Sequence, residues 1–74
     1  MGAPQITGLV IRQHGTNLYW SQNSKWDERL SEAVRWTNYR DMITCAQVNQ
    51  WPPSEQVWLG WKDRVIEVRR LHLV

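Results

Sequence analysis

Residues 9–20, LVIRQHGTNLYW, carry the local signal that decides the fold. The β-branched, apolar start of this stretch is typical of a strand, and the polar run at residues 14–17 is typical of a turn. Gly15 can adopt the positive φ required at the first central position of a two-residue type II′ loop. Because that loop places Ile11 opposite Trp20, the apolar pattern and the turn agree on one β-hairpin.

A second alternating stretch lies near the C-terminus. Strands over residues 57–61 and 64–68 flank a short turn, and a two-residue loop there places Leu59 opposite Ile66. After these strands the alternation of apolar and polar residues shifts, because Val68 and Leu71 cannot share a face in a regular strand. This shift predicts a β-bulge at residues 69–70. We therefore expect a second hairpin at this end of the chain.

Between the hairpins, the sequence predicts a helix over residues 39–49. Asn38 is a favourable N-cap, and Asp41 in the first turn complements the helix dipole. Apolar side chains then recur at helical spacing, at Tyr39, Met42, Ile43 and Ala46. Pro52 and Pro53 prevent the helix from continuing.

Residues 26–36 allow two interpretations. Apolar residues recur at helical spacing at positions 26, 30, 33 and 34. Residues 33–36 are also typical of a short strand, preceded by a turn at residues 30–32. We prefer the turn and short strand, and the helix stays open as the alternative.

Together these elements predict a two-layer α+β fold in the order β-β-(β)-α-β-β. An antiparallel sheet of two hairpins carries one helix packed on one face. The 74 residues are expected to form a single small domain, 1–74. The expected core residues are Leu9, Ile11, Leu18, Trp20, Met42, Ile43, Ala46, Leu59, Ile66 and Val68.

Residues 19–37 contain an ordered set of structural residues ahead of the expected helix. They are Tyr19-Trp20, Trp26, Leu30-Ser31, Ala33 and Trp36-Thr37. Over residues 7–50 this order resembles small α+β proteins encoded by bacteriophages and other mobile elements, most of them uncharacterised. The resemblance implies a compact α+β fold and a phage origin, and it implies no activity.

Charge and cysteine content are typical of a mildly basic protein from a reducing compartment. Nine Lys and Arg against seven Asp and Glu give a net charge of +2, with acidic and basic residues interleaved. The single Cys45 can form no internal disulfide, and no apolar run is long enough for a signal peptide or a membrane span. We therefore expect a cytoplasmic protein, in the host cytoplasm if phage-encoded, without a membrane partner.

No residue pattern points to catalysis, a metal or a cofactor. A Cys–His nucleophile needs its base beside the thiolate, whereas Cys45 has no fixed relation to His14 or His72. These three residues do not form a metal-ligand pattern, and the four glycines are scattered rather than grouped in a phosphate-binding loop. We therefore predict a protein that is not an enzyme and has no cofactor.

Six tryptophans without any phenylalanine are the unusual feature of the composition. Each buries about 150–250 Å² when enclosed, so we expect that a core of this size cannot enclose all six. Trp20 and Trp36 fit the expected core, whereas the tryptophans after the helix do not. Tryptophan and arginine are enriched at binding hot spots. The predicted protein-binding residues are Trp51, Trp58, Trp61, Arg64, Arg69 and Arg70.

The predicted function is that of a small non-enzymatic protein-binding module. One expected partner is a host protein, which the phage resemblance suggests it modulates or inhibits. The other is a second copy of the chain, since a thin core and spare tryptophans favour self-association. The alternative function is single-stranded nucleic-acid binding, with bases stacked on tryptophan and phosphates paired with arginine.

Overall fold

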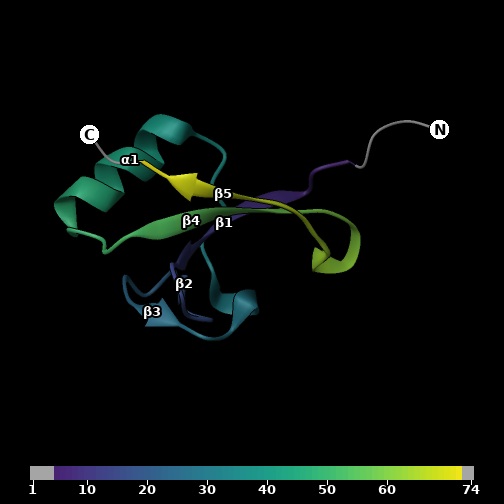
Figure 1. The fold of residues 1–74 in the computed structure, drawn as a ribbon, viewed down its shortest axis with the longest axis horizontal. Coiled ribbons are helices and arrows are strands. Elements are labelled where there is room, and N and C mark those ends of the chain that lie inside the picture. The colour runs from purple at the N-terminus through teal and green to yellow at the C-terminus, as the bar shows by residue number, and fades with distance from the viewer. Residues whose placement is uncertain (1–4, 73–74) are drawn as a thin grey trace.

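Five strands form one antiparallel sheet in the order β3-β2-β1-β4-β5, accompanied by one α-helix, in the computed structural model, which describes residues 5–72 (Figure 1). The strands are β1 (Gly8–Gln13), β2 (Tyr19–Trp20), β3 (Trp26–Asp27), β4 (Ser54–Leu59) and β5 (Val65–Leu71). The helix α1 covers Tyr39–Val48, and two 3₁₀ turns cover Leu30–Glu32 (η1) and Trp61–Asp63 (η2). The expected α+β class, with an antiparallel sheet and a helix, is confirmed.

The first hairpin has the register that its turn predicts. Arg12 pairs with Tyr19, but the expected position of Gly15 in the turn is wrong. The Thr16 N–H donates to the Gln13 carbonyl at 3.1 Å, so Gly15, with a φ of +77°, is the second central residue of the turn rather than the first. The returning strand β2 is shorter than the alternation suggests. The chain turns again at Ser24, where φ is +56°, and β3 then pairs with β2.

Strands β4 and β5 pair antiparallel, but the turn between them is longer than two residues because η2 occupies it. Leu59 pairs with Val65 rather than with Ile66, which places the bulge at Ile66. The bulge expected at residues 69–70 is wrong. Alternation is regular there and brings Leu71 to the helix side without any correction.

The helical interpretation of residues 26–36 is wrong. The turn expected at residues 30–32 is η1, whereas the strand expected over residues 33–36 is not formed. These residues are extended, Ala33 makes an isolated bridge with Ser21, and the Val34 N–H donates to the Trp20 carbonyl at 3.0 Å. A local cause lies at Asp27, whose carboxylate accepts the backbone N–H of Arg29 at 2.8 Å. This side-chain bond favours a turn where a helix would otherwise begin.

The helix α1 begins where the capping pattern predicts and ends one residue earlier. The side-chain oxygen of Asn38 accepts the N–H of Arg40 at 2.9 Å and that of Asp41 at 3.4 Å. Two free donors of the first turn are thereby satisfied. Met42 and Ala46 are the buried residues of the helix, so half of the expected apolar stripe faces the core fully.

Apolar side chains are buried on both faces of the sheet. The helix-side core consists of Leu9, Ile11, Trp20, Met42, Ala46, Trp51 and Leu71. The second core consists of Val10, Ala33, Val57 and Leu59, with Leu30 of η1 packed against it. The segment that contains η1 therefore covers the face that α1 does not.

The expectation of one core shared by both hairpins is wrong. Leu9 pairs with Trp58, and Val10 pairs with Val57. Cross-strand partners point to the same face, so Leu9 and Leu59 contribute to different cores. Of the expected core residues, Leu18, Ile43 and Ile66 are half-buried. Val68 is 40% exposed, because it lies on the edge strand β5.

Candidate functional site

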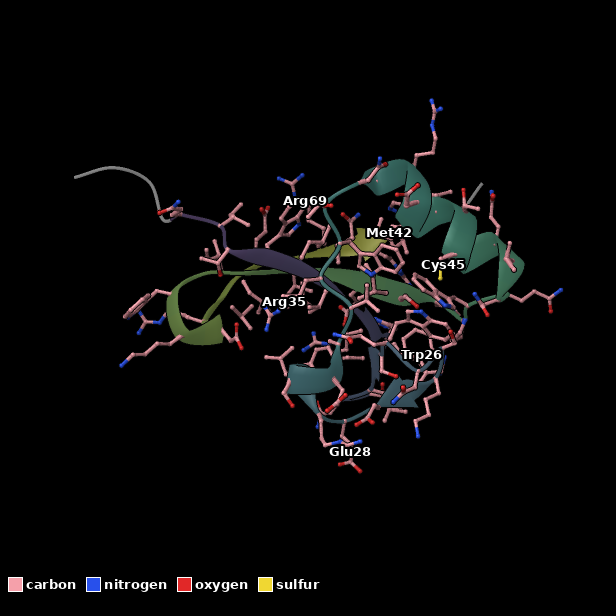
Figure 2. All side chains as sticks on the ribbon, turned by 180° about the vertical axis from the view of Figure 1, so that it is seen from behind. Trp26, Glu28, Arg35, Met42, Cys45 and Arg69 are labelled. Carbon is pink, nitrogen blue, oxygen red and sulfur yellow. The ribbon has the colours of Figure 1, made fainter. Side chains whose placement is uncertain are left out.

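Four of the tryptophans form an aromatic cluster on the helix side of the sheet. Trp51 is its centre, with ring centroids 5.2 Å from Trp20, 5.7 Å from Trp26 and 6.2 Å from Trp36. Cys45 of α1 packs against the same core, and Figure 2 shows it with Trp26 of β3. These rings are stacked edge-on or tilted, the arrangements that aromatic quadrupoles favour.

Two of the predicted contact residues, Trp51 and Trp58, pack in or against the helix-side core. Trp51 is only 7% exposed, and Trp58 is half-buried against the helix-side core. The chain reverses at Gln50, where φ is +51°, and the Trp51 N–H donates to the Ala46 carbonyl at 3.0 Å. This reversal brings the Trp51 ring back under the helix, where it is part of the helix-side core.

Trp61 is the exposed tryptophan, with 78% of its surface accessible. It lies in η2, where Lys62 and Asp63 both have positive φ, at 54° and 57°. Three backbone hydrogen bonds hold the turn. Gly60 N–H donates to the Arg64 carbonyl at 2.8 Å, Asp63 N–H to the Gly60 carbonyl at 3.0 Å, and Arg64 N–H to the Trp61 carbonyl at 3.1 Å. Left-handed non-glycine residues are strained, and such strain is concentrated at functional sites.

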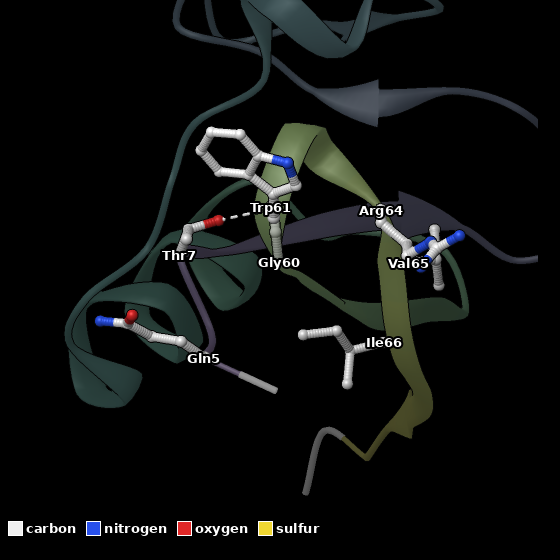
Figure 3. Close-up of a pocket in the computed structure, with 7 residues that line it drawn as sticks. All are labelled: Gln5, Thr7, Gly60, Trp61, Arg64, Val65 and Ile66. Atoms are coloured by element: carbon white, nitrogen blue, oxygen red, sulfur yellow. Dashed lines mark hydrogen bonds between the residues drawn. The ribbon is translucent and has the colours of Figure 1, made fainter. Parts of the chain in front are cut away.

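A pocket of about 400 Å³ opens beside Trp61 (Figure 3). We call it the loop pocket, and it is lined by Gln5, Thr7, Gly60, Trp61, Arg64, Val65 and Ile66. The Thr7 hydroxyl donates to the Gly60 carbonyl at 2.9 Å and ties the N-terminal wall to the loop. A Cβ atom at Gly60 would lie 2.6 Å from Ile66 Cδ1, so this glycine permits the close packing of the pocket floor.

The three predicted arginines do not form one surface. Arg64 lines the loop pocket beside Trp61. Arg69 forms an ion pair with Glu67, with 2.8 Å between Nε and Oε1. Arg70 is the next residue of β5 and therefore points to the opposite face. The structure thus brings together Trp61 and Arg64 at the loop pocket, whereas Trp51 and Arg70 line a different pocket with Pro52, Pro53 and Leu71.

Sequence reasoning missed most of the loop pocket's walls. Val65 was expected only as part of the strand over residues 64–68 and not as a site residue; it is 51% exposed and lines the pocket. Gln5 and Thr7 come from a segment that gives no local signal for this position. Their place follows from pairing of β1 with β4, which is a contact between distant parts of the chain.

Several titratable groups have structural partners. Hydrogen bonds from the Arg29 side chain and backbone lower the pKa of Asp27 to about 2. The Nδ1 atom of His14 lies 3.6 Å from a carboxylate oxygen of Glu55, which also pairs with Arg12 at 3.0 Å. These contacts explain why the carboxylates lie where they do, and they give no indication of a reactive centre.

Three broader observations complete the description of residues 5–72. No three His, Cys, Asp or Glu side chains within this range are grouped so that they could hold a metal ion. The helix of this region falls short of the length and apolar character needed to cross a membrane. No family model, curated protein or solved structure matches the chain.

Proposed function

We propose that the chain is a small non-enzymatic protein-binding module and that its contact surface is the loop pocket. The observation that carries the proposal is the position of Trp61. Its ring is 78% exposed at the edge of an apolar pocket and takes no part in either core. A large exposed aromatic side chain on a hydrogen-bonded turn is typical of a binding hot spot.

The walls of the loop pocket indicate what a partner would present. Trp61, Val65 and Ile66 give the pocket apolar walls, and about 400 Å³ is enough for a single large apolar side chain. Arg64 at the rim offers a planar fork that pairs with carboxylates. We therefore expect a protein segment with an apolar residue next to an Asp, a Glu or a free C-terminal carboxylate.

The shape of the turn supports binding with a small entropic cost. Its backbone hydrogen bonds order the main chain that carries Trp61 before any partner arrives. A loop that is already ordered loses less freedom on binding. Lys62 also lies over the Trp61 ring, with its Nζ atom 5.7 Å from the centroid, which restricts the ring further.

Single-stranded nucleic-acid binding is the weaker candidate. Trp61 beside Lys62 and Arg64 could stack on a base and pair with a phosphate. However, Arg69 is paired with Glu67 and Arg70 points to the opposite face. These arginines therefore do not form a continuous basic surface that could follow the phosphates of a nucleic acid. The net charge of +2 is also small.

Replacing Trp61 with alanine tests the proposal. We expect the free energy of unfolding to change by no more than about 0.5 kcal/mol, because an exposed side chain is removed. Binding to a protein partner should weaken by about 2 kcal/mol or more. The measurement is capture from a host lysate with immobilised protein, identification of the partner, and titration calorimetry with the purified partner.

Val48→Ala is the matched control, because Val48 is 76% exposed and lies on α1, away from the loop pocket. A partner that binds the wild type and Val48→Ala equally but not Trp61→Ala supports the proposal. Captured material that disappears after nuclease treatment favours the nucleic-acid alternative. Modulation of a host protein, in the host cytoplasm, remains a prediction that rests on the phage resemblance.

A further inference from the structure

The outer edge of β5 is a second candidate surface. Among the strands of residues 5–72, β5 has β4 as its one neighbour, and it is seven residues long. Such an edge presents a row of backbone N–H and C=O groups that a further strand can pair with. Val65 and Val68 on this strand are 51% and 40% exposed, and Glu67 and Arg69 carry the neighbouring charges.

We propose that a second copy of this chain pairs antiparallel with β5, related by a two-fold axis at Val68. This contact goes beyond the proposed function, because its central pairs at residues 67–69 lie outside the loop pocket and its partner is defined. The two sheets would join into one continuous sheet of ten strands, twice the five of one copy.

The length of β5 favours this register. Val68 is the middle residue of Val65–Leu71, so an axis there pairs each residue of the strand with a residue of the second copy. The three central pairs lie in the regular part of the strand, beyond the bulge at Ile66. Val68 meets Val68 of the second copy, which covers an apolar side chain that is exposed in the monomer.

The charges of β5 favour the same register. An axis at Val68 places Glu67 opposite Arg69 of the second copy, and the symmetry produces this pair twice. A shift of the axis by one residue would put either two Glu67 carboxylates or two Arg69 guanidinium groups directly opposite each other. Like charges in opposed positions are destabilising, whereas opposite charges are favourable.

The ion pair within each copy holds the charged side chains in the positions that the dimer contact requires. Arg69 Nε and Glu67 Oε1 are 2.8 Å apart, so both side chains already lie together on one face of β5. In the dimer the four groups form an alternating arrangement of positive and negative charges. The dimer also leaves no long strand edge unpaired. Each copy pairs its long edge strand β5, and the edge strand that stays free is β3, which has only two residues.

Charge reversal at β5 tests the register by sedimentation equilibrium. Glu67→Arg and Arg69→Glu each place like charges opposite each other, and we expect each to weaken the dimer by about tenfold or more. The double variant Glu67→Arg/Arg69→Glu restores opposite charges and should dimerise like the wild type. An equimolar mixture of the two single variants should form a mixed dimer, because their charges are complementary.

Glu28→Arg is the matched control for net charge, because Glu28 is exposed and lies at the opposite end of the molecule from Arg69 (Figure 2). It should leave the dimer unchanged, as should Trp61→Ala, whose effect is confined to partner binding. A wild type that stays monomeric at high micromolar concentration overturns the proposal. Single variants that dimerise as tightly as the wild type overturn it as well, and both results leave the loop pocket untouched.

Discussion

Replacement of Trp51 with alanine is expected to lower the free energy of unfolding by about 3–5 kcal/mol. Trp51 is 7% exposed and contacts three other tryptophan rings at the centre of the aromatic cluster. Its loss would open a large cavity between α1 and the strands. Since stability is typically about 0.05–0.15 kcal/mol per residue, this is a large part of the total for a chain of 74 residues.

Trp51→Phe is the companion variant that keeps the protein measurable if the alanine variant does not fold. The indole N–H of Trp51 is buried and has no acceptor among the described residues, so phenylalanine retains a ring and removes an unsatisfied donor. We expect it to lose less stability than alanine in a urea titration. If Trp51→Ala unfolds at the same urea concentration as the wild type, the aromatic cluster is not the core.

Leu59→Ala is expected to cost about 2–5 kcal/mol. Leu59 is buried in the second core together with Val10 and Val57, on the face that α1 does not cover. The substitution therefore measures whether that face has a real core of its own. Urea unfolding, followed by tryptophan fluorescence, gives the free energy directly.

The control for Leu59 is Val65→Ala, which changes the residue paired with it across the strands. Val65 is exposed, so its truncation should cost no more than about 0.5 kcal/mol. If both variants lose the same free energy of unfolding, Leu59 on the second face is as exposed to solvent as Val65 on the edge strand β5. The covering segment with η1 would then contribute little to the fold.

The parts of the fold that the sequence predicts well are those fixed by neighbouring residues. The first hairpin follows from the turn at Gly15, and the start of α1 follows from the cap at Asn38. The two cores could not be derived in this way. They depend on how β1 pairs with β4, and a shift of one residue in that register would exchange every side chain between the faces.

The tryptophans show the same division between local and distant causes. Trp61 was expected as the last residue of the strand over residues 57–61, whereas β4 ends at Leu59 and Trp61 lies in the turn η2, where it is exposed. Trp51 is buried because the chain reverses at Gln50 with a left-handed conformation. A glutamine gives no signal for that conformation, since it is unfavourable for most side chains. An aromatic residue before two prolines therefore suggested a surface loop.

The candidate site was accessible to sequence reasoning only in part. Trp61 and Arg64 are close in the chain and stay close in the structure. Arg69 and Arg70 are also adjacent in the sequence, yet a strand directs neighbours to opposite faces, so they cannot act as one cationic patch. The wall formed by Gln5 and Thr7 required knowledge of the sheet topology.

Hydrogen exchange at the six indole N–H groups, observed by ¹⁵N NMR, tests most directly the claim that the tryptophans divide into core residues and one surface residue. The Nε1 atoms of Trp36, Trp51 and Trp58 are buried, whereas Trp61 is 78% exposed. We expect fast exchange for Trp61 and strong protection for those three, because exchange of a buried group requires opening of the structure. Exchange of Trp51 as fast as that of Trp61 would contradict it.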